Sequence, residues 1–258
     1  PWKYFDECIE SKNEIPDPGS QRAPQAEEQL ILPEEIEYAE KSIPENSDLI
    51  RKPTYQSYTA KDYAPEWMTK IGQADTVLDI DTASVIESLA VEGGQHGIEW
   101  GTAIHAILEY SMLNPELDLN RIAKEEMRKN DLDSGLASSA VELVESVARS
   151  DIWKRAMKSD SRFTEFPFEI CLDESESNSL PTLVRGAIDL VFREPDGWVI
   201  VDYKTDFVTS NTIQSAVKKY TPQVLLYADI WKRTLNEPVK ESGLYFAAIN
   251  DYLTVRFQ

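Results

Sequence analysis

The sequence predicts an α/β domain in which a central mixed β-sheet is flanked by helices. Three observations support this fold class. Residues 186–206 contain two runs rich in Val, Ile and Phe on either side of Pro195-Asp196-Gly197, a pattern typical of a β-hairpin. Apolar residues recur with a helical period between residues 99 and 113. A chain of 258 residues is long enough to bury a sizeable core, as one large domain or two small ones.

The other elements follow from local patterns along the chain. Downstream of the hairpin, Thr221 suits a helix N-cap and Pro222 suits the first helical position. Two closing strands are expected over residues 243–249 and 252–257, joined by a turn at Asn250-Asp251. Upstream of the hairpin we expect, in order, helices over 120–129 and 134–149, a helical continuation over 152–158, a strand over 162–172 and an exposed loop over 173–179.

Residues 1–70 differ in composition from the rest of the chain. They hold eight of the fourteen prolines together with Glu-rich stretches, which predicts a linker or extended arm, partly disordered or docked, with a short helix over residues 33–41. Aromatic residues such as Trp67 leave docking of this arm onto the domain open. The domain itself is expected over residues 71–258. Because the chain begins at Pro1 without a methionine, we interpret it as a fragment of a longer protein.

Composition also bears on cofactors and location. With two cysteines and two histidines, we expect neither a structural zinc site nor an iron–sulfur cluster. The scarcity of cysteine favours a reducing, cytoplasmic compartment. The chain has no apolar run of about eighteen residues and no signal-peptide pattern, so we expect no membrane span. No GxxxxGK[ST] motif occurs, so the chain carries no ATP-binding P-loop.

The net charge of −20 bears directly on nucleic-acid binding. Phosphate contacts require Lys and Arg, and the acidic excess is not confined to the first 70 residues. DNA affinity of the isolated chain is therefore expected to be poor and strongly salt-dependent. Either other parts of a parent protein hold DNA, or the chain does not act on DNA. The densest basic cluster forms either a phosphate contact or a solvated helix face, and it comprises Lys154, Arg155, Lys158 and Arg162.

The predicted hairpin carries three charged residues. Asp189 lies in its first strand, whereas Asp202 and Lys204 lie two apart in its second strand and therefore share a face. If the two residues before Gly197 form the loop, Asp189 lies opposite Asp202 and the two carboxylates meet. The alternative turn, with Gly197 in a bulge, shifts the register by one residue.

Directly opposed carboxylates destabilise a sheet unless a cation lies between them. Oxygen ligands suit Mg²⁺, with Mn²⁺ as a substitute. A metal held by Asp189 and Asp202 would polarise a phosphodiester oxygen and lower the pKa of a bound water. Lys204 would stabilise the developing negative charge or orient that water. The hairpin therefore predicts metal-assisted phosphodiester hydrolysis.

Gly101 and His105 lie one turn apart in the helix expected over residues 99–113. Glycine costs about 1 kcal/mol in a helix relative to Ala, so Gly101 indicates that another group approaches closely there. A lone histidine on an apolar helix face is commonly a core residue, and the neighbouring glycine favours a functional role for His105.

Six motifs occur in a fixed order along the chain: GxxxH at 101–105, FTEFPF at 163–168, GAIDLVF at 186–192, VDYKTD at 201–206, YxxQxxLY at 220–227 and LYFAAI at 244–249. This ordered set resembles the PD-(D/E)XK nuclease superfamily, in particular its RecB/AddA branch. The resemblance implies a restriction-endonuclease-like core with Asp189, Asp202 and Lys204 as catalytic residues. It further implies that His105 joins the two aspartates at the metal. Gln223 and Tyr227 would contact substrate or brace the catalytic lysine, and Glu165 would have a supporting role.

The resemblance also implies a function and partners. It indicates a Mg²⁺-dependent deoxyribonuclease, acting as exonuclease or endonuclease, at the C-terminal end of an AddA-like, UvrD-type helicase–nuclease in DNA double-strand break repair. Expected partners are DNA, an N-terminal helicase region of the same polypeptide that would hold the ATP-dependent activity, and an AddB/RexB-like second subunit. The shortage of cysteine excludes the iron–sulfur members of the family. Two alternatives stay open, namely a non-catalytic module that docks DNA ends or a partner protein, and a stand-alone nuclease of the same fold.

Overall fold

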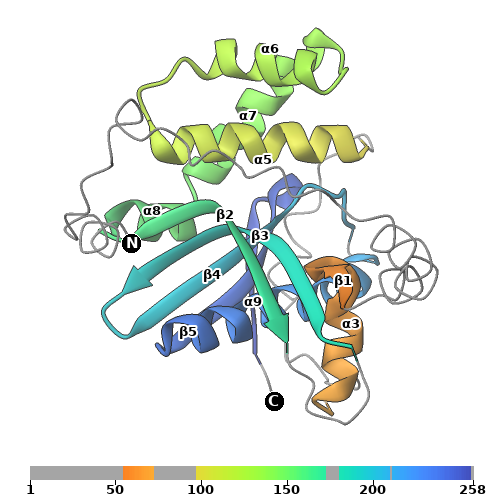
Figure 1. Cartoon of the computed structure of the whole chain (residues 1–258). Coiled ribbons are helices and arrows are strands. Elements are labelled where there is room, and N and C mark those ends of the chain that lie inside the picture. The colour runs from red at the N-terminus through yellow and green to blue at the C-terminus, as the bar shows by residue number, and fades with distance from the viewer. Residues whose placement is uncertain (1–54, 73–96, 173–179, 210, 257–258) are drawn as a thin grey trace, which may run out of the picture. The chain divides into compact units, whose positions relative to one another are not determined.

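A computed structural model describes residues 55–72, 97–172, 180–209 and 211–256 of the chain. In this part of the chain, six strands form one mixed sheet in the order β1-β3-β4-β5-β6, and β2 pairs with the other edge of β3 (Figure 1). The strands are β1 (Gln56–Thr59), β2 (Arg162–Leu172), β3 (Thr182–Glu194), β4 (Gly197–Lys204), β5 (Val239–Phe246) and β6 (Asp251–Val255). The helices are α3 (Ala60–Lys70), α5 (Ile98–Leu113), α6 (Leu119–Lys129), α7 (Ala137–Ala148), α8 (Asp151–Lys158) and α9 (Ile213–Leu235), with 3₁₀ turns η1 (Ser134–Leu136) and η2 (Ala247–Ile249).

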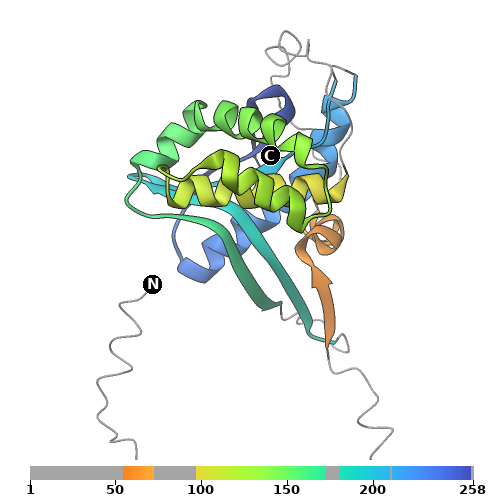
Figure 2. The ribbon, with the colours of Figure 1, turned by 90° about the horizontal axis from the view of Figure 1, so that it is seen from above.

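Helices cover both faces of the sheet, which confirms the predicted α/β architecture (Figure 2). Successive side chains of a strand point to opposite faces, and β4 divides its apolar residues accordingly. Ile200 packs in a core with α3 and α9, whereas Val199 and Val201 pack in a second core with α5, α6, α7 and α8. Strand β4 is therefore buried on both sides, and this explains its nearly continuous apolar run.

The hairpin has the register expected for a two-residue loop. β3 and β4 pair antiparallel from Glu194–Gly197 to Leu190–Val201. Gly197 adopts φ 145°, a conformation that favours glycine, and a Cβ there would lie 2.8 Å from the carbonyl oxygen of Pro238. The β3–β4 ladder ends one step before Asp189 and Asp202, so the strands separate where the charged residues begin.

Along one edge, strand β3 pairs with two different strands, one at each of its ends. Its second half pairs with β4, and its first half, from Thr182 to Arg185, pairs in parallel with β1. Strand β2 runs antiparallel along the opposite edge from Leu172 to Arg162. Residues 186–189 therefore lie between the two ladders of this edge.

Residues 55–70 were expected to belong to an arm, but in the structure they are part of the packed domain. The hydroxyl of Thr59 accepts a hydrogen bond from the Asp62 N–H at 3.2 Å and so caps α3. Tyr63 and Trp67 are buried in the core beneath α9. The expected boundary at residue 70 thus coincides with the end of α3, whereas the packed unit already includes β1 and α3. Residues 1–54 lie outside the described residues, as do the short helix expected at 33–41 and the loop expected at 173–179.

Helix α9 begins earlier than predicted. Thr221 is not its N-cap, because the hydroxyl of Thr221 donates to the Val217 carbonyl at 2.8 Å inside the helix. Pro222 lies within the helix, where a proline lacks the N–H donor and costs about 3 kcal/mol. The upstream residues Ile213, Val217 and Tyr220 recur at helical spacing and are buried, and their packing outweighs this cost.

Most other expected elements are confirmed within one to three residues, including β2, α6 and α7. The strand expected over 243–249 instead begins at Val239, and its last three residues form η2. Ser150 caps α8 as a separate helix rather than as a continuation of α7. Asn250 adopts a left-handed conformation with φ 53° at the turn before β6. Among the described helices, none combines the length and the apolar character that crossing a lipid bilayer requires.

Candidate active site

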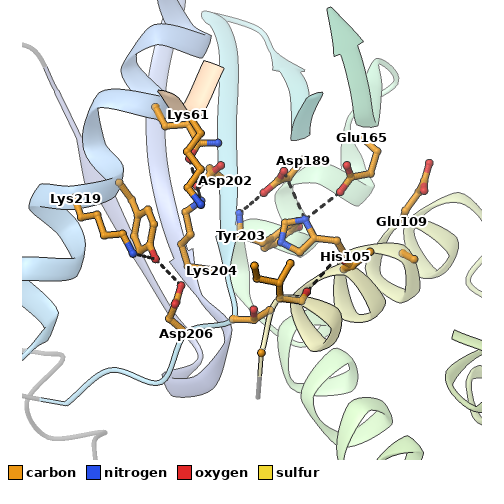
Figure 3. Close-up of a pocket in the computed structure, with 18 residues that line it drawn as sticks. Lys61, His105, Glu109, Glu165, Asp189, Asp202, Tyr203, Lys204, Asp206 and Lys219 are labelled. Atoms are coloured by element: carbon orange, nitrogen blue, oxygen red, sulfur yellow. Dashed lines mark hydrogen bonds and ion pairs between the residues drawn. The ribbon is translucent and has the colours of Figure 1, made fainter. Parts of the chain in front are cut away.

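The charged residues of the hairpin line a pocket of ≈ 790 Å³. Residues of α5, β2, β3, β4 and α9 contribute to its wall, and Lys61 of α3 joins them (Figure 3). Four carboxylates and a histidine lie on one side or at the centre, namely Glu109, Glu165, Asp189, Asp202 and His105. Lys61, Lys204 and Lys219 lie on the other side, together with Asp206. The structure thus brings together residues that are up to 162 positions apart in the chain, as Lys61 and Gln223 are.

Asp189 occupies the opening between the two ladders of β3. Its Oδ2 accepts a hydrogen bond from the backbone N–H of Tyr203 at 2.6 Å, in place of the ladder that ended at Leu190. Burial raises the pKa of Asp189 to about 7, although the charge of His105 opposes this effect. An additional cation beside this buried carboxylate would stabilise its ionised form.

Asp202 is fully buried beside the catalytic lysine expected from the sequence. The Lys204 Nζ lies 2.7 Å from the Asp202 Oδ2 as an ion pair. Among the described residues, neither carboxylate oxygen of Asp202 has a hydrogen-bond partner of ordinary geometry. Burial alone would lower the pKa of Lys204, but the charges of Asp202 and Asp189 outweigh it and raise that pKa. Lys204 is therefore held as a cation.

Three neighbours fix the ammonium group of Lys204. Besides Asp202, the Gln223 Oε1 accepts a hydrogen bond from the Lys204 Nζ at 3.2 Å. The Gln223 Nε2 in turn donates to the hydroxyl of Tyr227 at 2.7 Å, one helical turn further along α9. The Lys204 Nζ also lies 4.4 Å from the centroid of the Tyr220 ring, within range of a cation–π contact. Lys204, Gln223 and Tyr227 thus form one hydrogen-bonded series.

His105 projects from α5 toward the carboxylates. Its Nδ1 lies 3.1 Å from the Glu165 Oε1 and 3.6 Å from the Asp189 Oδ1. Burial would lower the pKa of His105, but the charge of Asp189 and the hydrogen bond with Glu165 outweigh it and raise the pKa to about 9. The close approach predicted at Gly101 is confirmed, because a Cβ there would lie 3.1 Å from the Thr205 Oγ1. Gly101 thus allows α5 to pack against the segment that follows Lys204.

Glu165 has an unusual backbone conformation for a strand residue. Its φ is 45°, in the left-handed region, and it has no ladder partner between the pairs Thr164–Leu190 and Phe166–Ile188. This conformation costs a non-glycine residue about 1–2 kcal/mol. The carboxylate of Glu165 reaches the His105 Nδ1.

The donor atoms in this pocket suit a divalent cation. Ligand atoms of His105, Glu165 and Asp189 all lie within 4.8 Å of one another. Asp202 is outside this group of three, but it lines the same pocket, and its buried oxygens lack hydrogen bonds from the described residues. Carboxylate oxygens with one imidazole nitrogen are ligands that Mg²⁺ and Mn²⁺ accept. Of the metal ligands expected from the sequence, the structure therefore groups His105 and Asp189 with Glu165, while Asp202 is paired with Lys204.

Several pocket residues were not anticipated from the sequence. Tyr220 lies within the YxxQ motif, but it was placed before the helix and given no role. Lys61 was assigned to the arm, and nothing in the local pattern marks Lys219. By contrast, the basic cluster around α8 does not line this pocket. Its Arg155 instead bonds with the carboxylates of Glu194 and Glu241.

Comparisons with known proteins agree with the geometry of the pocket. A family model described as the PD-(D/E)XK nuclease superfamily matches residues 83–256. An ATP-dependent helicase/nuclease subunit from Clostridium novyi (strain NT) is 33% identical over 166 residues, which cover 58% of this chain and 13% of that protein. Proteins of the same name from Clostridium acetobutylicum and Thermoanaerobacter sp. (strain X514) are each 28% identical, over 61% and 66% of this chain and 14% and 15% of their own lengths.

The chain spans about one seventh of the length of these curated relatives, so the similarity concerns one part of each. The family match covers more than half of the chain and includes every residue of the pocket wall except Lys61. The chain belongs to the PD-(D/E)XK nuclease superfamily.

Proposed function

We propose that this domain is a metal-dependent deoxyribonuclease that hydrolyses DNA phosphodiester bonds during the repair of double-strand breaks. One observation carries the proposal: a single pocket holds a buried Asp202–Lys204 ion pair beside the cluster of His105, Glu165 and Asp189. A module that only binds DNA gains nothing from burying like charges together, since each desolvated carboxylate destabilises the fold.

Each residue has a proposed role. His105, Asp189 and Asp202 hold the metal, and Glu165 orients His105 through the hydrogen bond at 3.1 Å. A bound Mg²⁺, or Mn²⁺ in its place, would supply Lewis acidity at the phosphate and lower the pKa of a neighbouring water. Lys204 stabilises the negative charge that develops on the phosphate, because its ammonium group is held in one position before the reaction.

Gln223 and Tyr227 act through Lys204. The amide of Gln223 accepts from the lysine and donates to Tyr227, so the three groups form one hydrogen-bonded series. Preorganised donors of this kind reorganise little during reaction and thereby favour the transition state.

The larger assembly is also part of the proposal. The relatives that share this domain are named as subunits of an ATP-dependent helicase/nuclease, and the chain corresponds to 13–15% of their lengths. We infer that a helicase region of the same polypeptide and an AddB/RexB-like second subunit deliver DNA to the pocket. The net charge of −20 supports this division of labour, because the domain alone is poorly suited to hold a polyanion. We also propose a cytoplasmic location, where the chromosomal DNA of the bacterial relatives lies.

The direct test is cleavage of linear single-stranded and double-stranded DNA at low salt with Mg²⁺ or Mn²⁺. Asp202→Asn and Lys204→Ala are expected to lower the cleavage rate by about a hundredfold or more, since each removes charge from the reacting centre. Lys218→Ala is the control, because this exposed residue of α9 does not line the pocket. Equal cleavage by all four proteins would contradict the proposal. A parent protein that neither cuts DNA nor binds Mn²⁺ would favour the docking module instead.

A further inference from the structure

The active-site pocket continues into a second, smaller groove. This groove of ≈ 290 Å³ lies between α3 and α9. It shares four residues with the wall of the larger pocket, namely Lys61, Lys219, Tyr220 and Gln223. A ligand held at Asp202 and Lys204 can therefore extend past Tyr220 into the space between the two helices.

Charge is distributed unequally around this path. Glu109, Glu165 and Asp189 lie on the α5 side of the pocket, whereas Lys61 and Lys219 lie on the side toward α3 and α9 (Figure 3). A polyanion that leaves the pocket on the α5 side meets carboxylates. One that leaves between α3 and α9 meets two lysines from different elements.

The two lysines have different surroundings. Lys61 is exposed in the first turn of α3, and no ion pair engages it among the described residues. The Lys219 Nζ donates to the hydroxyl of Tyr220 at 2.8 Å and lies 4.5 Å from the centroid of that ring. Lys204 contacts the same ring at 4.4 Å. Tyr220 thus connects the lysine at the reaction centre with the lysine at the entrance of the groove.

Two acidic groups near this path are already engaged. The Asp206 Oδ2 accepts a hydrogen bond from the Tyr220 hydroxyl at 2.8 Å. Asp62 lines the smaller groove, and its Oδ2 accepts from the Thr59 hydroxyl at 2.7 Å in the cap of α3. Both carboxylates keep their negative charge, but each is hydrogen-bonded to a local hydroxyl, and neither forms an ion pair with the ammonium group of Lys61 among the described residues.

We propose that the groove between α3 and α9 binds the phosphodiester backbone of a single DNA strand next to the scissile phosphate, with Lys61 and Lys219 as its phosphate contacts. The inference rests on the proposed nuclease function and adds to it the path of the substrate. It also accounts for substrate binding by a chain of net charge −20, because the few cations at the pocket are concentrated along one exit.

The test is the salt dependence of binding to a short, fluorescently labelled single-stranded oligonucleotide. A chelator is present throughout, so that the reading does not depend on cleavage. For a single strand, each phosphate contact that is lost makes the negative slope of log K against log[salt] shallower by about 0.7. Lys61→Ala and Lys219→Ala are therefore each expected to weaken binding several-fold at low salt and to reduce the slope by about that amount. Lys61→Arg and Lys219→Arg, which keep the charge, are expected to retain the parental slope.

Lys218→Ala is the matched control, since Lys218 is exposed beside Lys219 but lines neither pocket. Thermal unfolding of each variant shows whether the fold is retained. Because Lys61 is exposed, we expect Lys61→Ala to keep the parental Tm. Unchanged slopes for Lys61→Ala and Lys219→Ala, a Lys218→Ala effect of the same size, or no binding by the parent at low salt would each overturn the inference. Cleavage that depends on Asp202 together with unchanged slopes would leave the nuclease function standing and remove only this path. Altered slopes in a protein that never cuts DNA would support the binding path and remove the nuclease function.

Discussion

Gly101 offers a way to separate the stability of this domain from its activity. A methyl group at this position would lie 3.1 Å from the Thr205 Oγ1, closer than ordinary van der Waals contact. Gly101 belongs to α5, which carries His105, and Thr205 directly follows Lys204. In Gly101→Ala, either the helix or the segment after β4 must therefore shift by a few tenths of an ångström.

The two consequences of Gly101→Ala have opposite signs. Alanine favours a helix over glycine by about 1 kcal/mol, and the local crowding offsets part of this gain, so the free energy of unfolding should rise by about 0–1 kcal/mol. A misplacement of about 1 Å costs about a hundredfold in rate, so a shift of a few tenths should lower kcat about fivefold. The variant is thus expected to be as stable as the parent or more stable, yet slower.

Urea denaturation and single-turnover cleavage of DNA measure these two quantities. The double variant Gly101→Ala, Thr205→Ala removes the crowding atom, so it should recover most of the rate that Gly101→Ala loses relative to Thr205→Ala alone. Parental kcat in Gly101→Ala would show that the contact between Gly101 and Thr205 does not position the catalytic groups. So would rate losses that simply add in the double variant, because the contact between the two residues would then have no effect.

Three further predictions concern other parts of the domain. Arg155→Met should lower the free energy of unfolding by about 2 kcal/mol in urea denaturation, because it leaves Glu194 and Glu241 without their shared, half-buried partner. The hydrogen bonds from Arg155, with a further contribution from Lys240, lower the pKa of Glu194 from 4.5 to about 2, so the stabilisation by Arg155 is present above pH 4.5 and disappears as the pH falls toward 2. Parent and Arg155→Met should therefore converge in stability over that range, and a constant difference would contradict the assignment. Tyr220→Leu should lower kcat about tenfold while Tyr220→Phe stays near the parent, because the ring supports Lys204; equal losses in both variants would argue against the cation–π contact.

The hairpin and its charges were predictable because they depend on short-range rules. Loop length fixed the register from Gly197 onward, and side-chain alternation placed Asp202 and Lys204 on one face. The close approach at Gly101 was also predictable, since glycine destabilises a helix relative to alanine and therefore indicates a packing constraint. That the approaching group is Thr205 depends on how α5 packs against the sheet, and no local pattern encodes it.

The errors have a common origin in long-range packing. Lys61 was missed because proline content dominated the interpretation of residues 1–70, whereas burial of Tyr63 and Trp67 decides that α3 belongs to the core. Pro222 indicated a helix start, but buried residues upstream extend α9 through it. Glu165 was expected in a supporting role, but its contact with His105 joins residues 60 positions apart, which sequence spacing does not reveal.

The central claim is that this pocket binds a divalent cation. The most direct measurement is the anomalous diffraction of crystals of this domain grown with Mn²⁺. We expect one strong peak in contact with Asp189 and His105, with oxygen of Asp202 completing the ligand set. The Asp189→Asn protein should lose that peak and keep its fold. No peak in the pocket, or peaks only at carboxylates outside it, would contradict the account.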